Sequence, residues 1–592
     1  MLAFGALIDL SLASLAPEMT ARLRQSLPAI PGRVSISGQG EVALACLADV
    51  RAVPFDAELP LTDGDLFIAG TLRIDAREEL RAALSSEAPR ALADASDARL
   101  VALAYRAWGE RLAEHLLGDY AFIVWDRARR RLVCARDPHG NRQLFWGRVG
   151  SVVAVGGGIE TVRFLPGVSG DLHDPSVRGF LQHGWVEEAD RTVYREVRRV
   201  PAAHTLTIDG GSAATLRRHW EFPVPSPIRY RQADDYVAHF TEVLHACVRD
   251  RMRAPSAAVL LSGGMDSTML AVAARHVAPD VPLSAFTLSY PTLAPSGDDT
   301  LSVEVAARLG LPHRVLDFDR TRALSYLDDL ASLPSQPLDE AELAITRESL
   351  AVVAAAAPVV LYGEDGDWLM HAPTLLTQLR SQPLAEVVGA WSGYWWSTGR
   401  RPWVGLEWRI RRDRWLGAPR IDRTPWLRAG TSVVTTSPRR SAEHPLRPRT
   451  VRALSAPIWD ALYEALSPTT TLAPVLHTLP LVDPRLLAFV FAIPPVPWCQ
   501  DKQLFRAAMR GALPSAVLTR PKTPLGGFME ARVAQWRAVG GADTVISDRV
   551  APWVDVEGVR RVLRAGTPSE VCDAWRVLQV DRWLEREGNR RA

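Results

Sequence analysis

The amino-acid sequence predicts an α/β protein with two domains, and three observations support this fold class. The first 208 residues contain short apolar segments separated by turn residues, a pattern typical of β-strands. After Tyr230 the chain alternates helical patterns with short, continuous apolar runs, which indicate buried parallel strands. One of these runs leads into a glycine-rich loop that opens a helix, an arrangement that binds phosphate. With 592 residues, the chain is long enough for each domain to have its own core.

The N-terminal domain is predicted over residues 1–208. Its apolar segments predict strands at 121–125, 131–135 and 152–155. Two stretches with apolar residues spaced close to 3.6 residues apart predict helices at 76–85 and 98–117.

Residues 209–230 are rich in glycine, serine and proline, and we expect them to be a linker. The second domain is then predicted over 231–592. Its apolar runs predict parallel strands at 257–261, 283–288 and 359–361.

Composition and charge exclude several classes of protein. Hydrophobic residues make up 47% of the chain and the formal net charge is +2, so nucleic acid is not expected as a partner. The longest apolar run, 350–362, is shorter than the ~20 residues that span a bilayer. Five scattered cysteines and an N-terminus without a charged signal region indicate a cytoplasmic protein.

The sequence AAVLLSGGMDSTMLAVAA, residues 257–274, has the features of a phosphate-binding loop. Two glycines let the backbone approach an anion, and the N-terminus of the following helix supplies a positive field. Two serine hydroxyls add donors, and the aspartate is placed to hold Mg²⁺. These candidate binding residues are Ser262, Gly263, Gly264, Asp266 and Ser267.

A second loop, in VVLYGEDGDWL (359–369), is acidic. Glu364, Asp365 and Asp367 surround two glycines, and their charges repel one another unless a cation lies among them. Both loops follow strands of the same predicted sheet, so they are expected to face one crevice at its carboxyl edge. Asp266 and Asp367 are therefore the predicted metal ligands.

With these two loops, the chain resembles the glutamine-dependent (class B) asparagine synthetase family. SGGMDS and YGEDGD match that family's synthetase loops, and SGGMDS resembles the pyrophosphate loop of N-type ATP pyrophosphatases. LLGDYAFIVWDRARRRLVCARDPHGNRQLFW (116–146) looks like the family's glutaminase domain. Segments 479–495, 501–509 and 513–524 resemble its C-terminal helices. The resemblance implies an N-terminal Ntn-hydrolase-like αββα sandwich and a C-terminal adenine-nucleotide α-hydrolase domain, with ATP and Mg²⁺ as cofactors.

The resemblance also assigns residues to the nucleotide. By family match, Leu260 and Leu288 flank the base of ATP, with Tyr362 and Gly363 nearby.

Two further residues receive catalytic roles. Of 69 basic residues only Lys502 and Lys522 are lysines. Lys522, in RPKTP, matches the family lysine that stabilises negative charge at the reacting centre, and Lys502 is a second candidate. Glu364 is the candidate for orienting the attacking amine and accepting its proton.

The chain departs from the family at its N-terminus. The glutaminase nucleophile of that family is a cysteine directly after the initiator Met, whereas this sequence begins Met1-Leu2-Ala3. We therefore expect no glutaminase activity and a retained, inactive scaffold. The amine must then already belong to a substrate, as in β-lactam synthetases and lasso peptide cyclases.

The segment 390–426 favours a peptide substrate. It contains seven of the 19 tryptophans, together with Tyr394 and several arginines. These residue types are enriched in peptide-binding surfaces, although a pair of Trp-rich helices packed on the core would explain them equally well.

The sequence thus predicts an ATP-dependent lasso peptide cyclase. It would adenylate an Asp or Glu side chain of a precursor peptide and form a macrolactam with the N-terminal amine, releasing AMP and pyrophosphate. A leader-binding protein and a leader peptidase would be its partners. The alternatives are a β-lactam synthetase-like or other small-molecule amide synthetase, and a non-catalytic homologue.

Overall fold

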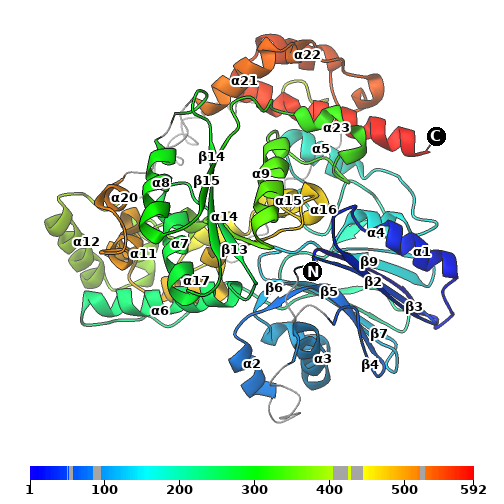
Figure 1. The fold of residues 1–592 in the computed structure, drawn as a ribbon, viewed down its shortest axis with the longest axis horizontal. Coiled ribbons are helices and arrows are strands. Elements are labelled where there is room, and N and C mark those ends of the chain that lie inside the picture. The colour runs from blue at the N-terminus through cyan, green and yellow to red at the C-terminus, as the bar shows by residue number, and fades with distance from the viewer. Residues whose placement is uncertain are drawn as a thin grey trace.

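The computed structural model describes residues 1–49, 51, 58–84, 95–295, 297–403, 424–428, 444–520 and 527–591. Two antiparallel sheets occupy the blue and cyan part of Figure 1, and a parallel sheet lies in its green part. The helices near the C-terminus cover the top of the molecule in this view. The predicted α/β class is confirmed.

The N-terminal part is a sandwich of two six-stranded antiparallel sheets. The first sheet has the order β10-β8-β9-β1-β3-β2, formed by Arg198–Arg199, Phe145–Val149, Val152–Gly156, Ala3–Asp9, Val42–Ala48 and Arg33–Gln39. The second has the order β12-β11-β7-β6-β5-β4, formed by Thr215–Arg218, His204–Asp209, Arg131–Arg136, Gly118–Asp126, Leu66–Ile74 and Leu61–Asp63.

Helices cover the outer faces of this sandwich. Helices α1 (Pro17–Gln25) and α4 (Ile159–Arg163) contact the first sheet, whereas α3 (Asp97–Trp108), beside α2 (Arg77–Leu84), contacts the second. The core between the sheets includes Phe4, Leu44 and Phe122, all buried. This is the predicted αββα arrangement, and the expected strands are present. The helix expected over 76–85 corresponds to α2, whereas the one expected over 98–117 ends at Trp108 and continues as a 3₁₀ helix over Gly109–His115.

The predicted linker contains part of the sandwich. Strand β11 ends at Asp209, and β12 pairs with it antiparallel over His204↔Arg218 to Thr207↔Thr215. Gly210 and Gly211 have φ angles of +51° and +89°, which suit the tight turn of a hairpin. These glycines therefore form a hairpin turn, and the longest stretch of the predicted linker without helix or strand is 219–230.

The C-terminal part contains one sheet of five parallel strands in the order β15-β14-β13-β16-β17. These strands are His313–Asp317, Leu283–Ser289, Ala257–Leu260, Val359–Leu361 and Leu476–Thr478. Val259 and Leu361 pack into the cluster that contains residues of α6 (Ala233–Arg251) and α7 (Met265–Val277). Ala258 and Val360 pack with residues of α9 (Leu343–Ala356) instead. Both faces are covered, which explains the continuous apolar runs.

The other helices complete the molecule. They are α5 (Asp174–His183), α8 (Asp298–Leu309), α10 (Gly366–Leu369), α11 (Leu375–Ser381), α12 (Leu384–Thr398), α14 (Pro448–Leu454), α15 (Ile458–Ala465), α16 (Pro468–Thr471), α17 (Pro484–Ala492), α18 (Pro495–Trp498), α19 (Gln503–Ala508), α20 (Ser515–Thr519), α21 (Phe528–Ala538), α22 (Val556–Ala565) and α23 (Pro568–Arg591). Among the described residues, none of the helices combines the length and the apolar character needed to cross a bilayer.

Candidate active site

The two predicted loops lie together at the carboxyl edge of the parallel sheet. Strands β13 and β16 are neighbours, with Ala258 opposite Val360. A Cβ atom added to Gly363 would lie 2.6 Å from the backbone nitrogen of Ser267, and one added to Gly366 would lie 2.6 Å from Cγ of Asp266. Glycine at these two positions therefore permits the acidic loop to pack directly on the phosphate loop.

The phosphate loop is ordered by its own serines. Ser262 donates its backbone N–H to Oγ of Ser267 at 3.1 Å, and the two hydroxyl oxygens are 3.0 Å apart. Gly263 has a φ of +66°, and α7 begins at Met265 without a side-chain cap on Gly264. The start of α7 carries a partial positive charge, which favours a bound anion.

Lys502 joins the two loops. Its Nζ atom is 2.5 Å from Oδ2 of Asp266 and 2.8 Å from Oδ1 of Asp367. Asp501 and Lys502 have φ angles of +45° and +56°, so two consecutive non-glycine residues adopt the left-handed conformation beside the site. The predicted metal-binding pair therefore meets at one position, and a positive charge is already held there.

The sequence ranks Lys502 behind Lys522, whereas the structure places Lys502 at the site. The available signal was its rarity, because it is one of two lysines. Lys522, the predicted catalytic lysine, lies outside the described residues, as do Trp408 and Trp415 of the Trp-rich segment.

The three acids of the acidic loop have different surroundings. Glu364 is exposed, and the side chain of Asp367 is 41% exposed. Asp365 is buried with a φ of +71°, and Tyr463 donates its hydroxyl to Oδ2 of Asp365 at 3.4 Å. Burial, together with the charge of Glu364, raises the pKa of Asp365 to about 7. The sequence did not separate these roles, because burial depends on α15, which lies far along the chain.

The residues matched to the nucleotide lie along the same edge. Leu260, Leu288 and Tyr362 are half-buried at or just after the ends of β13, β14 and β16. Tyr362 donates its backbone N–H to the carbonyl of Thr478 at 3.0 Å, which joins the start of the acidic loop to β17. All three therefore border the edge where the two loops meet.

The carboxylate pair fits Mg²⁺. The described residues contain no group of three or more His, Cys, Asp or Glu side chains at metal-binding distance. Mg²⁺ bound together with nucleotide needs only one or two carboxylates, because phosphate and water supply the other ligands. The Lys502 ammonium shows that Asp266 and Asp367 converge closely enough to hold one cation.

Comparison with known families decides the assignment. Residues 239–585 match the family model described as asparagine synthase, which spans more than half of the chain, and residues 44–220 match the glutamine amidotransferase domain. The chain belongs to the asparagine synthase family. The second match extends beyond the predicted domain boundary at 208 and includes β12.

The curated relatives of this asparagine synthase family member include enzymes described as amidases and enzymes described as asparagine synthetases. The amidase chyE of Penicillium rubens is 26% identical, over 46% of this chain and 42% of its own. A putative glutamine-hydrolysing asparagine synthetase of Mycobacterium tuberculosis is 27% identical, over 50% and 46%. Asparagine synthetase 3 of Bacillus subtilis is 26% identical, over 43% and 40%. The chain thus spans less than half the length of these relatives.

Proposed function

We propose that this protein is an ATP-dependent amide-forming ligase, and specifically a lasso peptide cyclase. The observation that carries the ligase assignment is the convergence of Asp266, Asp367 and Lys502 at the phosphate loop, within an asparagine synthase family domain. An acid pair with one cation is suited to binding a nucleotide with its metal.

The first step activates a carboxyl group. The loop 262–267 would hold the β and γ phosphates, and Leu260 and Leu288 would flank the base of ATP. Tyr362 and Gly363 would lie nearby. Asp266 and Asp367 would hold Mg²⁺, which offsets charge on the leaving pyrophosphate. A substrate carboxylate oxygen bonds to the α-phosphorus as the bond to pyrophosphate breaks. Lys502, which pairs with Asp266 and Asp367, would add a positive charge beside the loop that holds the phosphates.

The second step forms the amide. The amine nitrogen bonds to the activated carbonyl carbon, AMP leaves, and the exposed carboxylate of Glu364 accepts the amine proton. Lys522 matches the family lysine, and its positive charge would stabilise the oxyanion. A peptide α-amine has a pKa near ~8, so making it neutral at pH 7 costs only about 1 kcal/mol. Positioning of the two groups is therefore the larger part of the task.

The amine comes from the substrate rather than from glutamine. Residues 1–220 contain two cysteines, Cys46 and Cys134, and both are buried in strands of the sandwich. Burial raises the pKa of the Cys46 thiol to about 12, and it raises that of Cys134 as well. Neither thiol has the exposure or the ionisation that a nucleophile requires.

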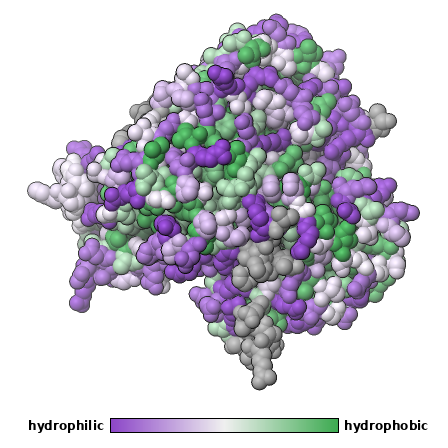
Figure 2. All heavy atoms as spheres, in the orientation of Figure 1, coloured by the Kyte–Doolittle hydropathy of each residue, from purple (hydrophilic) through white to green (hydrophobic). Residues whose placement is uncertain are grey.

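An exposed helix supports a peptide substrate. On α12, Leu384, Val388, Trp395 and Trp396 are 66%, 57%, 55% and 88% exposed. The helix lies at the left edge of Figure 1, and Figure 2 shows hydrophilic and hydrophobic residues intermixed over this face of the molecule. On the buried side of α12, the Tyr394 hydroxyl lies 3.5 Å from Oδ2 of Asp501, the neighbour of Lys502, so the helix contacts the turn that holds this lysine.

Exchange of radioactive pyrophosphate into ATP tests the proposal. Peptides with an internal Asp or Glu and small carboxylated amino acids would be compared, with and without a leader-binding protein and a leader peptidase. We expect exchange that requires a peptide and is lost in Asp367→Ala and Lys522→Ala. The cyclised product should weigh one water less than the leader-free core peptide.

Exchange with small substrates alone would favour the small-molecule alternative, which the matches to enzymes described as asparagine synthetases support. Absence of ATP binding would contradict both ligase assignments and would favour a non-catalytic homologue.

A further inference from the structure

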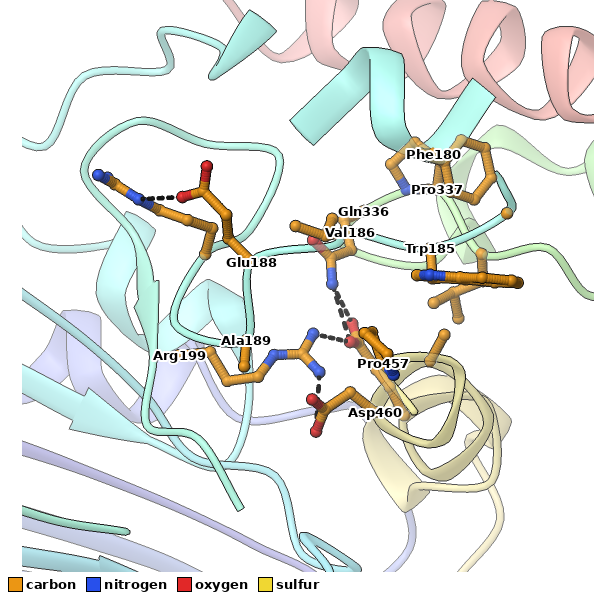
Figure 3. A pocket seen from close by; sticks show the side chains of 15 residues that line it. Phe180, Trp185, Val186, Glu188, Ala189, Arg199, Gln336, Pro337, Pro457 and Asp460 are labelled. Carbon is orange, nitrogen blue, oxygen red and sulfur yellow. Dashed lines mark hydrogen bonds and ion pairs between the residues drawn. The ribbon is translucent and has the colours of Figure 1, made fainter. Parts of the chain in front are cut away.

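The sandwich and the synthetase part meet at a hollow beside α15. Figure 3 shows its residues, with the Arg199 guanidinium pointing toward Asp460 and the Gln336 amide approaching the same group of charges. Arg199 belongs to β10 of the sandwich, whereas Asp460 belongs to α15.

The charges at this junction are buried and paired across the two parts. Arg199 is 4% exposed, and its Nη2 lies 2.7 Å from Oε2 of Glu464. Its Nη1 is 3.4 Å from Oδ1 of Asp460, which also lies 2.8 Å from Nη2 of Arg136. Gln336 donates its amide to both oxygens of Glu464, at 3.0 and 2.8 Å. Two arginines of the sandwich thus bind two acids of α15, and breaking one such buried pair is costly.

The same helix contacts the acidic loop on another side. Tyr463, which lies between Asp460 and Glu464 in sequence, donates its hydroxyl to Asp365 at 3.4 Å. Its ring stacks with His477 of β17, with ring centroids 6.3 Å apart. The acidic loop therefore rests on α15.

A second contact from the sandwich reaches the strand beneath the loop. Arg142 donates Nη2 to the carbonyl of His477 at 2.9 Å. Strand β17 pairs with β16, whose end leads into the acidic loop. The sandwich thus supports the loop both through α15 and through β17.

We infer that Arg199 is a positioning residue for the acidic loop, acting through Glu464, Asp460 and Tyr463 of α15. The chemistry of that loop rests on the proposed function, because Glu364 and Asp367 are its proposed proton acceptor and metal ligand. The sandwich, without a usable nucleophile, is then a structural part of the synthetase site. A chain that no longer hydrolyses glutamine would still require it.

The test compares Arg199→Met with Arg198→Met in the full chain. Arg198 is a matched control, since it lies beside Arg199 in β10 and pairs with Asp190, also within the sandwich. Hydrogen exchange of residues 362–370 is the first readout, and it does not depend on catalysis. We expect faster exchange by between about twofold and thirtyfold in Arg199→Met and no change in Arg198→Met.

The second readout is the Mg²⁺ concentration that gives half-maximal ATP–pyrophosphate exchange. It should rise by a similar factor, between about twofold and thirtyfold, in Arg199→Met, with Arg199→Lys recovering part of the loss. A general loss of folded protein would lower activity without moving this concentration. If the wild type shows no ATP chemistry, the proposed function fails while the hydrogen-exchange result still tests the inference.

Tyr463→Phe keeps the inference testable if Arg199→Met does not fold, because it removes one hydroxyl and leaves the charged junction intact. It should also speed hydrogen exchange of 362–370. Unchanged exchange in folded Arg199→Met and in Tyr463→Phe, or equal effects in Arg198→Met, would overturn the inference.

Discussion

The ammonium nitrogen of Lys502 lies 2.5 Å from a carboxylate oxygen of Asp266, although 236 residues separate them in the chain. The same nitrogen contacts Asp367 at 2.8 Å, so one ammonium group pairs with an acid from each loop. The lysine side chain is 19% exposed, which strengthens this interaction relative to a surface ion pair.

Replacing Lys502 with Met should impair use of ATP without unfolding the protein. A hydrogen bond between charged groups contributes about 1.5–3 kcal/mol, so kcat/KM for MgATP should fall by about 10- to 100-fold. Lys502→Arg, which keeps the charge, should retain more activity than Lys502→Met. Steady-state kinetics check this, and wild-type kcat/KM in Lys502→Met would remove the lysine from the site.

Gly366→Ala should displace Asp266. The added Cβ would lie 2.6 Å from Cγ of Asp266, whose carboxylate can rotate away but then leaves Lys502. Misplacement of a reacting group by about 1 Å can cost about 100-fold in rate, and we expect a loss of this size in ATP–pyrophosphate exchange. Gly393→Ala on α12 is the control, because nothing lies within 4 Å of its Cβ. Equal activity of the two variants would contradict close packing of the loops.

Stability should fall on acidification partly because of His477. The ring is buried, and burial lowers its pKa to about 3, against about 6.5 when the chain is unfolded. Arg142 also lowers this pKa, whereas Asp119 opposes the shift. Below pH 6.5 the unfolded chain therefore binds a proton that the folded one does not, and stability is lost as the pH falls toward 3.

Each pH unit in this window costs about 1.4 kcal/mol for one histidine, or about 2 kcal/mol between pH 6.5 and 5. The stability advantage of the wild type over His477→Gln should shrink by this amount, as measured by urea unfolding at pH 7 and pH 5. A difference that is independent of pH would show that His477 titrates normally in the fold.

Replacing the exposed tryptophans of α12 should weaken binding of the peptide without destabilising the fold. Trp395 and Trp396 are 55% and 88% exposed, so replacing both with Ser should change stability by less than about 1 kcal/mol. If they anchor the substrate, KM for the peptide should rise about 30-fold, since such anchors contribute about 2 kcal/mol or more. KM for MgATP should stay constant. Val545→Ser, at a residue that is 81% exposed outside α12, is the control.

Local patterns in the sequence were sufficient for the fold class and for the two loops. Continuous apolar runs predicted β13, β14 and β16, and the loops follow from glycines and acids placed directly after two of these strands. Parallel strands bring their carboxyl ends to one edge of the sheet, so the sequence alone predicts that Asp266 and Asp367 lie close together.

What the sequence could not determine depends on residues far apart in the chain. The selection of Lys502 over other polar groups required α19 and its preceding turn to pack against α7, and the burial of Asp365 required α15. The turn at Gly210–Gly211 joins the paired strands β11 and β12, and β11 in turn pairs with β7 of the second antiparallel sheet. The Arg199–Glu464 pair joins residues 265 apart across two parts of the molecule. Short-range periodicity carries information on burial and on strand ends, whereas partner choice for a buried charge is decided by tertiary packing.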